Sequence, residues 1–180
     1  EYLAVIGDTK KQLAQNFLTN LRDATKGRNL IQRRLRQLGQ AIGMNLEIEV
    51  PREYAILFPY ESRRPSREEA LFKKQIEAVR GLAAEWAKEN PASVVDRIAK
   101  FQRESSDTRT NWPNYLHHMP TMLAEALPSE GLIQWAGLLI ARTTSAQFTA
   151  SFADEIAKDK PDGYRDFLKT MLIDDVHGVG

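Results

Sequence analysis

Three proline corners, each placed between two stretches of helical apolar period, constrain this chain most. The first corner is Asn90-Pro91, at the centre of LAAEWAKENPASVVDRIAKF. Upstream of it, apolar residues from Leu71 to Trp86 recur at steps of three and four, which is the period of a helix with one apolar face. Pro91 cannot continue a helical hydrogen-bond ladder but is tolerated in the first turn of a helix. The stretch therefore predicts a helix, a corner and a second helix.

Two further stretches repeat this pattern. They are MLAEALPSEGLIQWAGLLIA, with its corner at Pro128, and FADEIAKDKPDGYRDFLKTML, with its corner at Pro161. The three prolines are 37 and then 33 residues apart. Helical pairs at such a period predict an α-solenoid, in which each pair hides its apolar face by stacking on its neighbours. The alternative is an irregular helical bundle with proline-marked turns.

The proline corners and the apolar period of residues 66–173 resemble those of HEAT and armadillo repeats. Such repeats are found in the C-terminal arms of large multidomain bacterial NTPases and in scaffold proteins. The resemblance implies recognition of a protein partner along the inner wall of the stack. It carries over no catalytic residue.

Residues 1–60 predict a helical pair followed by a short extended segment. Asp8 or Thr9 is expected to cap a helix that buries Leu13, Phe17, Leu18 and Leu21 and ends at Gly27. Asn29 is expected to cap the next helix, which ends at Gly43.

The segment after this pair changes period. Leu46, Ile48 and Val50 alternate with glutamates, which is typical of a half-buried strand, and residues 55–58 form a second β-prone run. We therefore expect a mostly α-helical protein with at most a short two-stranded hairpin near 46–58, or an extended connector lying on helices. The polar residues 61–67 suggest a linker, and residues 174–180 a tail.

The composition limits the class of protein. Apolar residues make up 42% of the 180, which is ordinary for a globular chain. No run of about 18 apolar residues is present, so we expect no membrane span. There is no cysteine, which excludes disulfides and leaves the compartment open. No secretory leader pattern is present, and we expect a cytoplasmic location. Because the chain starts at Glu1, we expect it to be part of a longer protein.

The net charge of +1 conceals an asymmetry. Residues 1–80 hold 15 Lys and Arg against 10 Asp and Glu, whereas residues 81–180 hold 10 against 14. The basic excess is concentrated between Arg22 and Arg36. Candidate phosphate contacts are Arg28, Arg33, Arg34, Arg36, Arg63 and Arg64. A basic surface of this kind resembles that of HEAT-like DNA glycosylases and would bind nucleic acid electrostatically. The patch is short and lacks interleaved aromatic residues, which favours a solvated helix face instead.

The sequence holds no strong motif for catalysis or metal binding. Adjacent His117 and His118 point about 100° apart on a helix and do not form the i, i+4 pair of zinc helices. Asp174, Asp175 and His177 lie near the chain end. A polar loop near the histidines holds the hydroxyl residues Ser105, Ser106, Thr108 and Thr110. No Walker A, GxGxxG or EF-hand motif is present.

Three hypotheses follow, in order of preference. The first is a protein-interaction or scaffold segment without intrinsic catalysis, metal or cofactor. The second is a nucleic-acid-binding helical domain that uses the Arg22–Arg36 region. The third is an enzyme centred on His117 and His118 or on the acidic tail. The sequence leaves the partner and the oligomeric state open.

Overall fold

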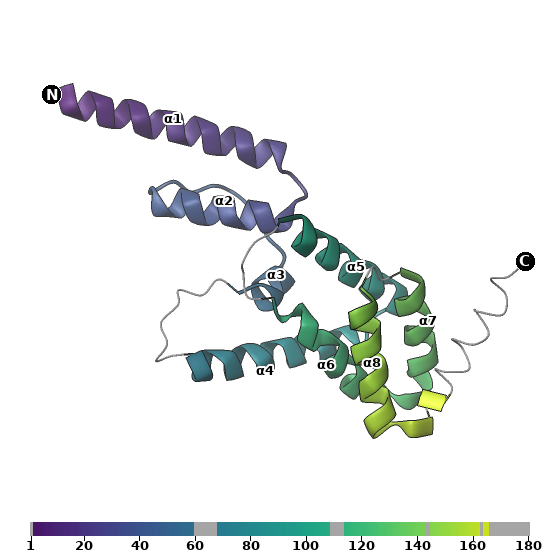
Figure 1. Ribbon diagram of the computed structural model, residues 1–180. Coiled ribbons are helices and arrows are strands. Elements are labelled where there is room, and N and C mark those ends of the chain that lie inside the picture. The colour runs from purple at the N-terminus through teal and green to yellow at the C-terminus, as the bar shows by residue number, and fades with distance from the viewer. Residues whose placement is uncertain (1, 60–67, 109–113, 143–144, 163, 166–180) are drawn as a thin grey trace, which may run out of the picture.

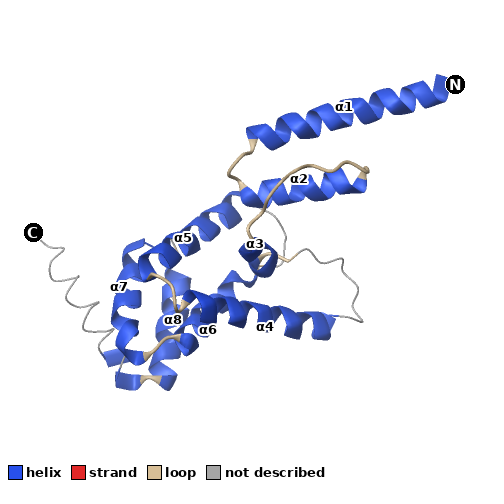
Figure 2. Ribbon diagram, turned by 180° about the vertical axis from the view of Figure 1, so that it is seen from behind, coloured by secondary structure: helices blue, strands red, loops and turns tan. Residues whose placement is uncertain are grey.

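The computed structural model describes residues 2–59, 68–108, 114–142, 145–162 and 164–165. The regular secondary structure within these residues is all helical, with no strand, which confirms the mostly α fold (Figures 1 and 2). The α-helices are α1 (Tyr2–Ala24), α2 (Asn29–Ala41), α3 (Arg52–Leu57), α4 (Glu68–Trp86), α5 (Pro91–Thr108), α6 (Met119–Ala126), α7 (Leu132–Arg142) and α8 (Ala146–Asp159). Two short 3₁₀ helices are η2 (Tyr115–His118) and η3 (Ser129–Gly131).

The three proline corners lie where the sequence predicts them. Helix α4 ends four residues before Asn90, whose side-chain oxygen accepts a hydrogen bond from the Ser93 amide (3.3 Å) at the start of α5. Pro128 separates α6 from η3 and α7, and Pro161 follows the end of α8. The predicted second helix of the third pair falls almost wholly outside the described residues.

The helices of successive pairs stack in two series. Helix α4 packs on α6 and α6 on α8, while α5 packs on α7. Two sets of contacts fix the direction of the first series. Phe72, early in α4, meets Tyr115 just before α6, and Arg80, further along α4, pairs with Glu125 near the end of α6 (3.7 Å). The two helices are therefore parallel, as expected of hairpins stacked in the same orientation.

Polar contacts link the successive pairs. The Arg142 guanidinium at the end of α7 donates to both oxygens of Asp96 in α5, at 2.8 and 2.9 Å. The Lys160 ammonium, next to the third corner, donates to the carbonyl oxygens of Ala124 (2.8 Å) and Leu127. Because the last carbonyls of a helix have no partner within the helix, Lys160 serves as a C-terminal cap for α6.

The N-terminal helical pair differs from the expectation in how both helices begin. Helix α1 starts at Tyr2, so Asp8 and Thr9 lie inside it and do not cap it. Asn29 is the first residue of α2 and Arg28 holds the N-cap position, so the predicted cap at Asn29 is also wrong. Both predicted ends are confirmed, since Gly27 (φ 86°) and Gly43 (φ 72°) follow the two helices in a conformation that favours glycine.

The predicted inward face of α1 is only partly buried. Leu18 is 7% exposed and Leu21 is half-buried, but Leu13 and Phe17 are 64% and 65% exposed. The prediction that Leu13 and Phe17 are core residues is wrong for this chain, because the described part of the molecule places no helix against that side of α1.

An extended connector, residues 44–51, replaces the predicted hairpin. Leu46 and Ile48 are buried against α1 and α2 whereas Glu47 and Glu49 are exposed, so the alternation is real although no strand pairs with it. The connector approaches α2 at Gly39, where a Cβ atom would come within 3.0 Å of the Met44 carbonyl oxygen. The β-prone residues 55–58 overlap α3 instead, so that prediction is wrong.

One hydrophobic core runs from α2 to α8. It includes Trp86, Phe101, Trp135 and Phe152, so these two tryptophans pack between helices. A smaller cluster joins α1, α2 and the connector through Leu18, Leu35, Leu46 and Ile48. The linker predicted at residues 61–67 lies outside the described residues. Among the helices that the structure describes, none is both long and apolar enough to span a bilayer.

Candidate partner-binding surfaces

Arg33, the central candidate of the basic helix, points into the protein. It is 8% exposed, and its Nη1 atom donates to the carbonyl oxygens of Tyr54 (2.8 Å) and Phe58. Burial and, to a lesser extent, the neighbouring Arg36 lower the pKa of Arg33. The side chain thus closes the end of α3 and is not presented to a phosphate. The apolar neighbours Leu30 and Leu35 place this side of α2 inward, but the sequence alone did not separate Arg33 from Arg34.

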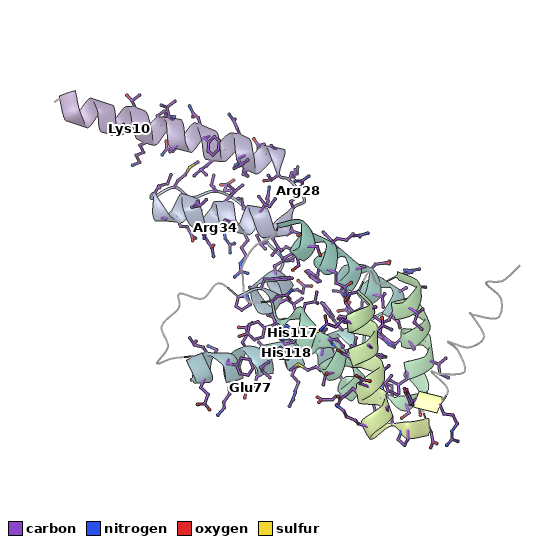
Figure 3. The ribbon with its side chains drawn as sticks, viewed as in Figure 1. Lys10, Arg28, Arg34, Glu77, His117 and His118 are labelled. Atoms are coloured by element: carbon purple, nitrogen blue, oxygen red, sulfur yellow. The ribbon has the colours of Figure 1, made fainter. Side chains whose placement is uncertain are left out.

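The remaining arginine candidates have different positions. Arg28 and Arg34 are exposed, at the turn before α2 and on its outer side, and Figure 3 shows both on the arm formed by α1 and α2. Arg36 is half-buried and its Nη1 atom lies 3.4 Å from the Ile48 carbonyl oxygen. Arg63 and Arg64 lie outside the described residues. The nucleic-acid hypothesis therefore keeps Arg28 and Arg34 as its main exposed candidates.

The two histidines meet each other and an aromatic side chain of α4. Their ring centroids are 3.9 Å apart, and the His118 ring also lies edge-on to Phe72, with a centroid distance of 6.1 Å. Tyr115 contacts both Phe72 and His118. Figure 3 shows His117 and His118 together beside α4, well away from Arg34. We call Leu71, Phe72, Tyr115, His117 and His118 the aromatic patch.

The aromatic patch combines exposure with apolar character. Leu71 and Phe72 are 43% and 46% exposed, His117 is exposed, and His118 is half-buried. Burial, and then the nearby imidazole of His117, lower the pKa of His118. His118 is therefore neutral near pH 7 and can pack as an aromatic ring. The helical period placed Leu71 on the buried face of α4, which its exposure contradicts, and it gave no signal for Phe72, whose exposure depends on where the neighbouring helices end.

A polar cavity of about 340 Å³ lies next to this patch. Its walls come from the end of α5, from η2 and from the start of α8, and they include Ser105, Ser106, Asn114, His117, Ser145 and Ser151. The structure therefore brings together the serines and one of the histidines that the sequence placed near each other.

Asn114 lies between the candidate nucleophile and the candidate base. The side-chain amide of Asn114 donates to Ser105 Oγ (3.1 Å), and its backbone carbonyl oxygen contacts His117 Nδ1. A catalytic pair needs a nucleophile and a base within about 2.6–3.2 Å of each other. Ser105 and His117 each contact Asn114, and these contacts stabilise the η2 turn. They do not form a nucleophile–base pair that would support the enzyme hypothesis.

The other candidates for chemistry fall elsewhere. Asp174, Asp175, His177 and Thr110 lie outside the described residues. Within the part of the chain that the structure describes, His, Asp and Glu side chains form no group of three that could hold a metal ion. Comparison with known proteins finds no match among family models, curated proteins or solved structures.

Proposed function

We propose that this chain is a protein-interaction segment of a larger protein, a scaffold of HEAT- or armadillo-type helical hairpins. The proposal is supported by the parallel α4, α6 and α8 series and by the second series of α5 and α7. Each hairpin hides its apolar face on the next one, so the stack is a rigid support whose outer side chains are available to a partner.

The observation that carries the proposal is the aromatic patch. Phe72 belongs to the first hairpin, whereas Tyr115 and His118 belong to the start of the second. The apolar surface therefore spans two successive hairpins, and it exists only because they stack. Exposed aromatic side chains in a preorganised setting are the residues that most often anchor protein partners.

The proposed partner is a protein that packs an apolar side chain onto the exposed edges of Phe72 and His118. Because His118 contributes a neutral ring, this contact weakens when that ring is protonated in acidic buffer. No group transfer or cofactor is part of this function.

Site-specific photocrosslinking tests the proposal. A benzophenone amino acid replaces Phe72 in the chain, which is irradiated in a lysate of the source cells, and crosslinked proteins are identified by mass spectrometry. We expect one dominant protein at position 72. The matched control is the same group at Ile133, which is 42% exposed on α7. Identical crosslinks at both positions, or none at position 72, would contradict the proposal.

A further inference from the structure

We infer that the exposed face of α1 pairs with the same face of a second copy of this chain in an antiparallel homodimer. The inference does not depend on the aromatic patch, which lies on other helices. It starts from Leu13 and Phe17, which have the largest exposed fractions, 64% and 65%, among the large apolar residues described. They lie four residues apart and therefore on one side of the helix.

This side of α1 is not covered by the rest of the chain. Leu18 faces α2 and the connector, and Leu13 and Phe17 are turned from it by roughly 140° and 100° about the helix axis. Figure 1 and Figure 2 both show α1 at the outer edge of the molecule, with α2 beside it. Leu38 and Ile42 of α2 are 42% and 41% exposed, but they share the side of α2 that carries the exposed Arg34 and are not counted with the α1 face.

The charge on this face favours a second copy over a charged partner. Between residues 8 and 24, the positions within about 60° of the midline between Leu13 and Phe17 are Thr9, Lys10, Asn20, Leu21 and Ala24. Lys10 is the charged residue of this set. A nucleic acid or an acidic protein would require several cations along its contact, whereas an almost neutral face with a central apolar pair can be complementary to itself.

The spacing along α1 supports an antiparallel arrangement. A two-fold axis passing midway between Leu13 and Phe17 places Leu13 against Phe17 of the second copy. The same axis places Lys10 against Asn20 of the second copy. The two Lys10 side chains then lie roughly 15 Å apart along the helices, beyond the screening length of about 8 Å in physiological salt.

The area of the interface predicts a weak dimer. An aromatic side chain buries roughly 150–250 Å² in full, so Leu13 and Phe17, each about two-thirds exposed, together offer on the order of 200 Å² per copy. Two copies then bury on the order of 400 Å² from these side chains, and their neighbours on α1 enlarge a contact that stays below about 1,200 Å², in the range of weak, transient interfaces. We expect a dissociation constant on the order of 10 μM to 100 μM.

Sedimentation velocity of the full chain from about 5 to 500 μM, a range chosen to bracket the expected constant, tests the inference. We expect the mass to rise from the monomer value of 20.5 kDa towards twice that value. Phe17→Ser should weaken dimerisation by about tenfold or more, with an unchanged circular dichroism spectrum. The matched control is Ile133→Ser on α7, where the side chain is 42% exposed, and this variant should dimerise like the natural chain. A monomer at every concentration, or a dimer unaffected by Phe17→Ser, would overturn the inference.

Disulfide trapping tests the orientation. The chain has no cysteine, so the double variant Lys10→Cys/Asn20→Cys introduces the only thiols. Within one α1 these positions are roughly 15 Å apart, which is too far for an intramolecular bridge. Oxidation should give a covalent dimer from the double variant and little from either single variant. Efficient crosslinking of Lys10→Cys alone would indicate a parallel dimer and overturn the antiparallel arrangement.

Discussion

The Tyr54 hydroxyl donates a hydrogen bond to Glu104 Oε1 at 2.9 Å and accepts one from Asn29 Nδ2 at 3.0 Å. The other carboxylate oxygen of Glu104 lies 3.4 Å from the Leu30 amide, in the first turn of α2. The first amides of a helix have no partner within it, so Glu104 of α5 caps α2 from outside. Tyr54 and Glu104 thus join the N-terminal helices to the stacked hairpins.

Replacing the Tyr54 hydroxyl tests that link. Tyr54→Phe keeps the ring, which packs at 4.7 Å between centroids against Phe101, and removes the two hydrogen bonds. Because Glu104 and Asn29 then lose a partner in a partly buried site, we expect a loss of about 1–3 kcal/mol in the free energy of unfolding. Urea denaturation measures this loss, and an unchanged midpoint would show that the link contributes nothing to stability.

The same residue predicts a dependence on alkaline pH. Burial raises the pKa of the Tyr54 hydroxyl above its ordinary value, and Glu104 raises it further. The unfolded chain releases this proton near pH 10 while the folded chain retains it, so stability falls as pH rises above 10. For each pH unit above 10, the free energy of unfolding of the natural chain should fall by up to about 1.4 kcal/mol more than that of Tyr54→Phe. Denaturation of both proteins between pH 9 and 11 measures the difference, which should be constant if Tyr54 ionises normally.

Arg33 and Arg34 provide a matched pair of adjacent residues. Arg33→Ala leaves the carbonyl oxygens of Tyr54 and Phe58 without their buried donor, and we expect a loss of about 2–4 kcal/mol in the free energy of unfolding. Arg34→Ala on the exposed side should change it by about 0.5 kcal/mol or less. Chemical denaturation of both variants is the measurement, and equal effects would argue against an inward Arg33.

Lys160 tests the contact between successive corners. Lys160→Met removes the donor to the Ala124 and Leu127 carbonyl oxygens but keeps most of the side-chain volume. We expect a loss of about 1–3 kcal/mol, since hydrogen bonds from a charged donor are stronger than neutral ones. The control is Lys158→Met, whose ion pair with Glu155 is exposed at the lysine end and contributes about 0–1 kcal/mol. Thermal unfolding should separate the two variants clearly, and coincident curves would contradict the capping role.

The nucleic-acid hypothesis makes a quantitative prediction of its own. If Lys26, Arg28 and Arg34 each neutralise one phosphate, the logarithm of the affinity for duplex DNA should fall with the logarithm of salt concentration at a slope of about −2.7. Arg28→Gln/Arg34→Gln should reduce that slope to about −0.9. Fluorescence anisotropy at several salt concentrations measures both values. Absence of binding in low salt would leave these cations as a solvated surface.

The local periodicities in the sequence determined the helices and their corners. Apolar residues at steps of three and four, interrupted by Pro91, Pro128 and Pro161, leave the backbone few alternatives, because proline cannot donate within a helix. The glycines that follow α1 and α2 end these helices for a similarly local reason, because they adopt a backbone conformation that other residues disfavour. The sequence also predicted that Leu46 and Ile48 are buried while the glutamates between them are exposed. Whether a second strand pairs with this segment depends on residues distant in the sequence, and the alternation does not specify it.

Tertiary structure alone decided which members of an apolar or basic set face inward. Leu13, Phe17 and Leu18 share one apolar pattern, yet only Leu18 is buried, because α2 and the connector cover a single side of α1. Arg33 and Arg34 are identical residues whose environments differ because α3 folds against one side of α2. The aromatic patch likewise requires Phe72 and His118, 46 residues apart, to meet across two stacked hairpins. Such contacts depend on how helices pack, and no local pattern in the sequence contains that information.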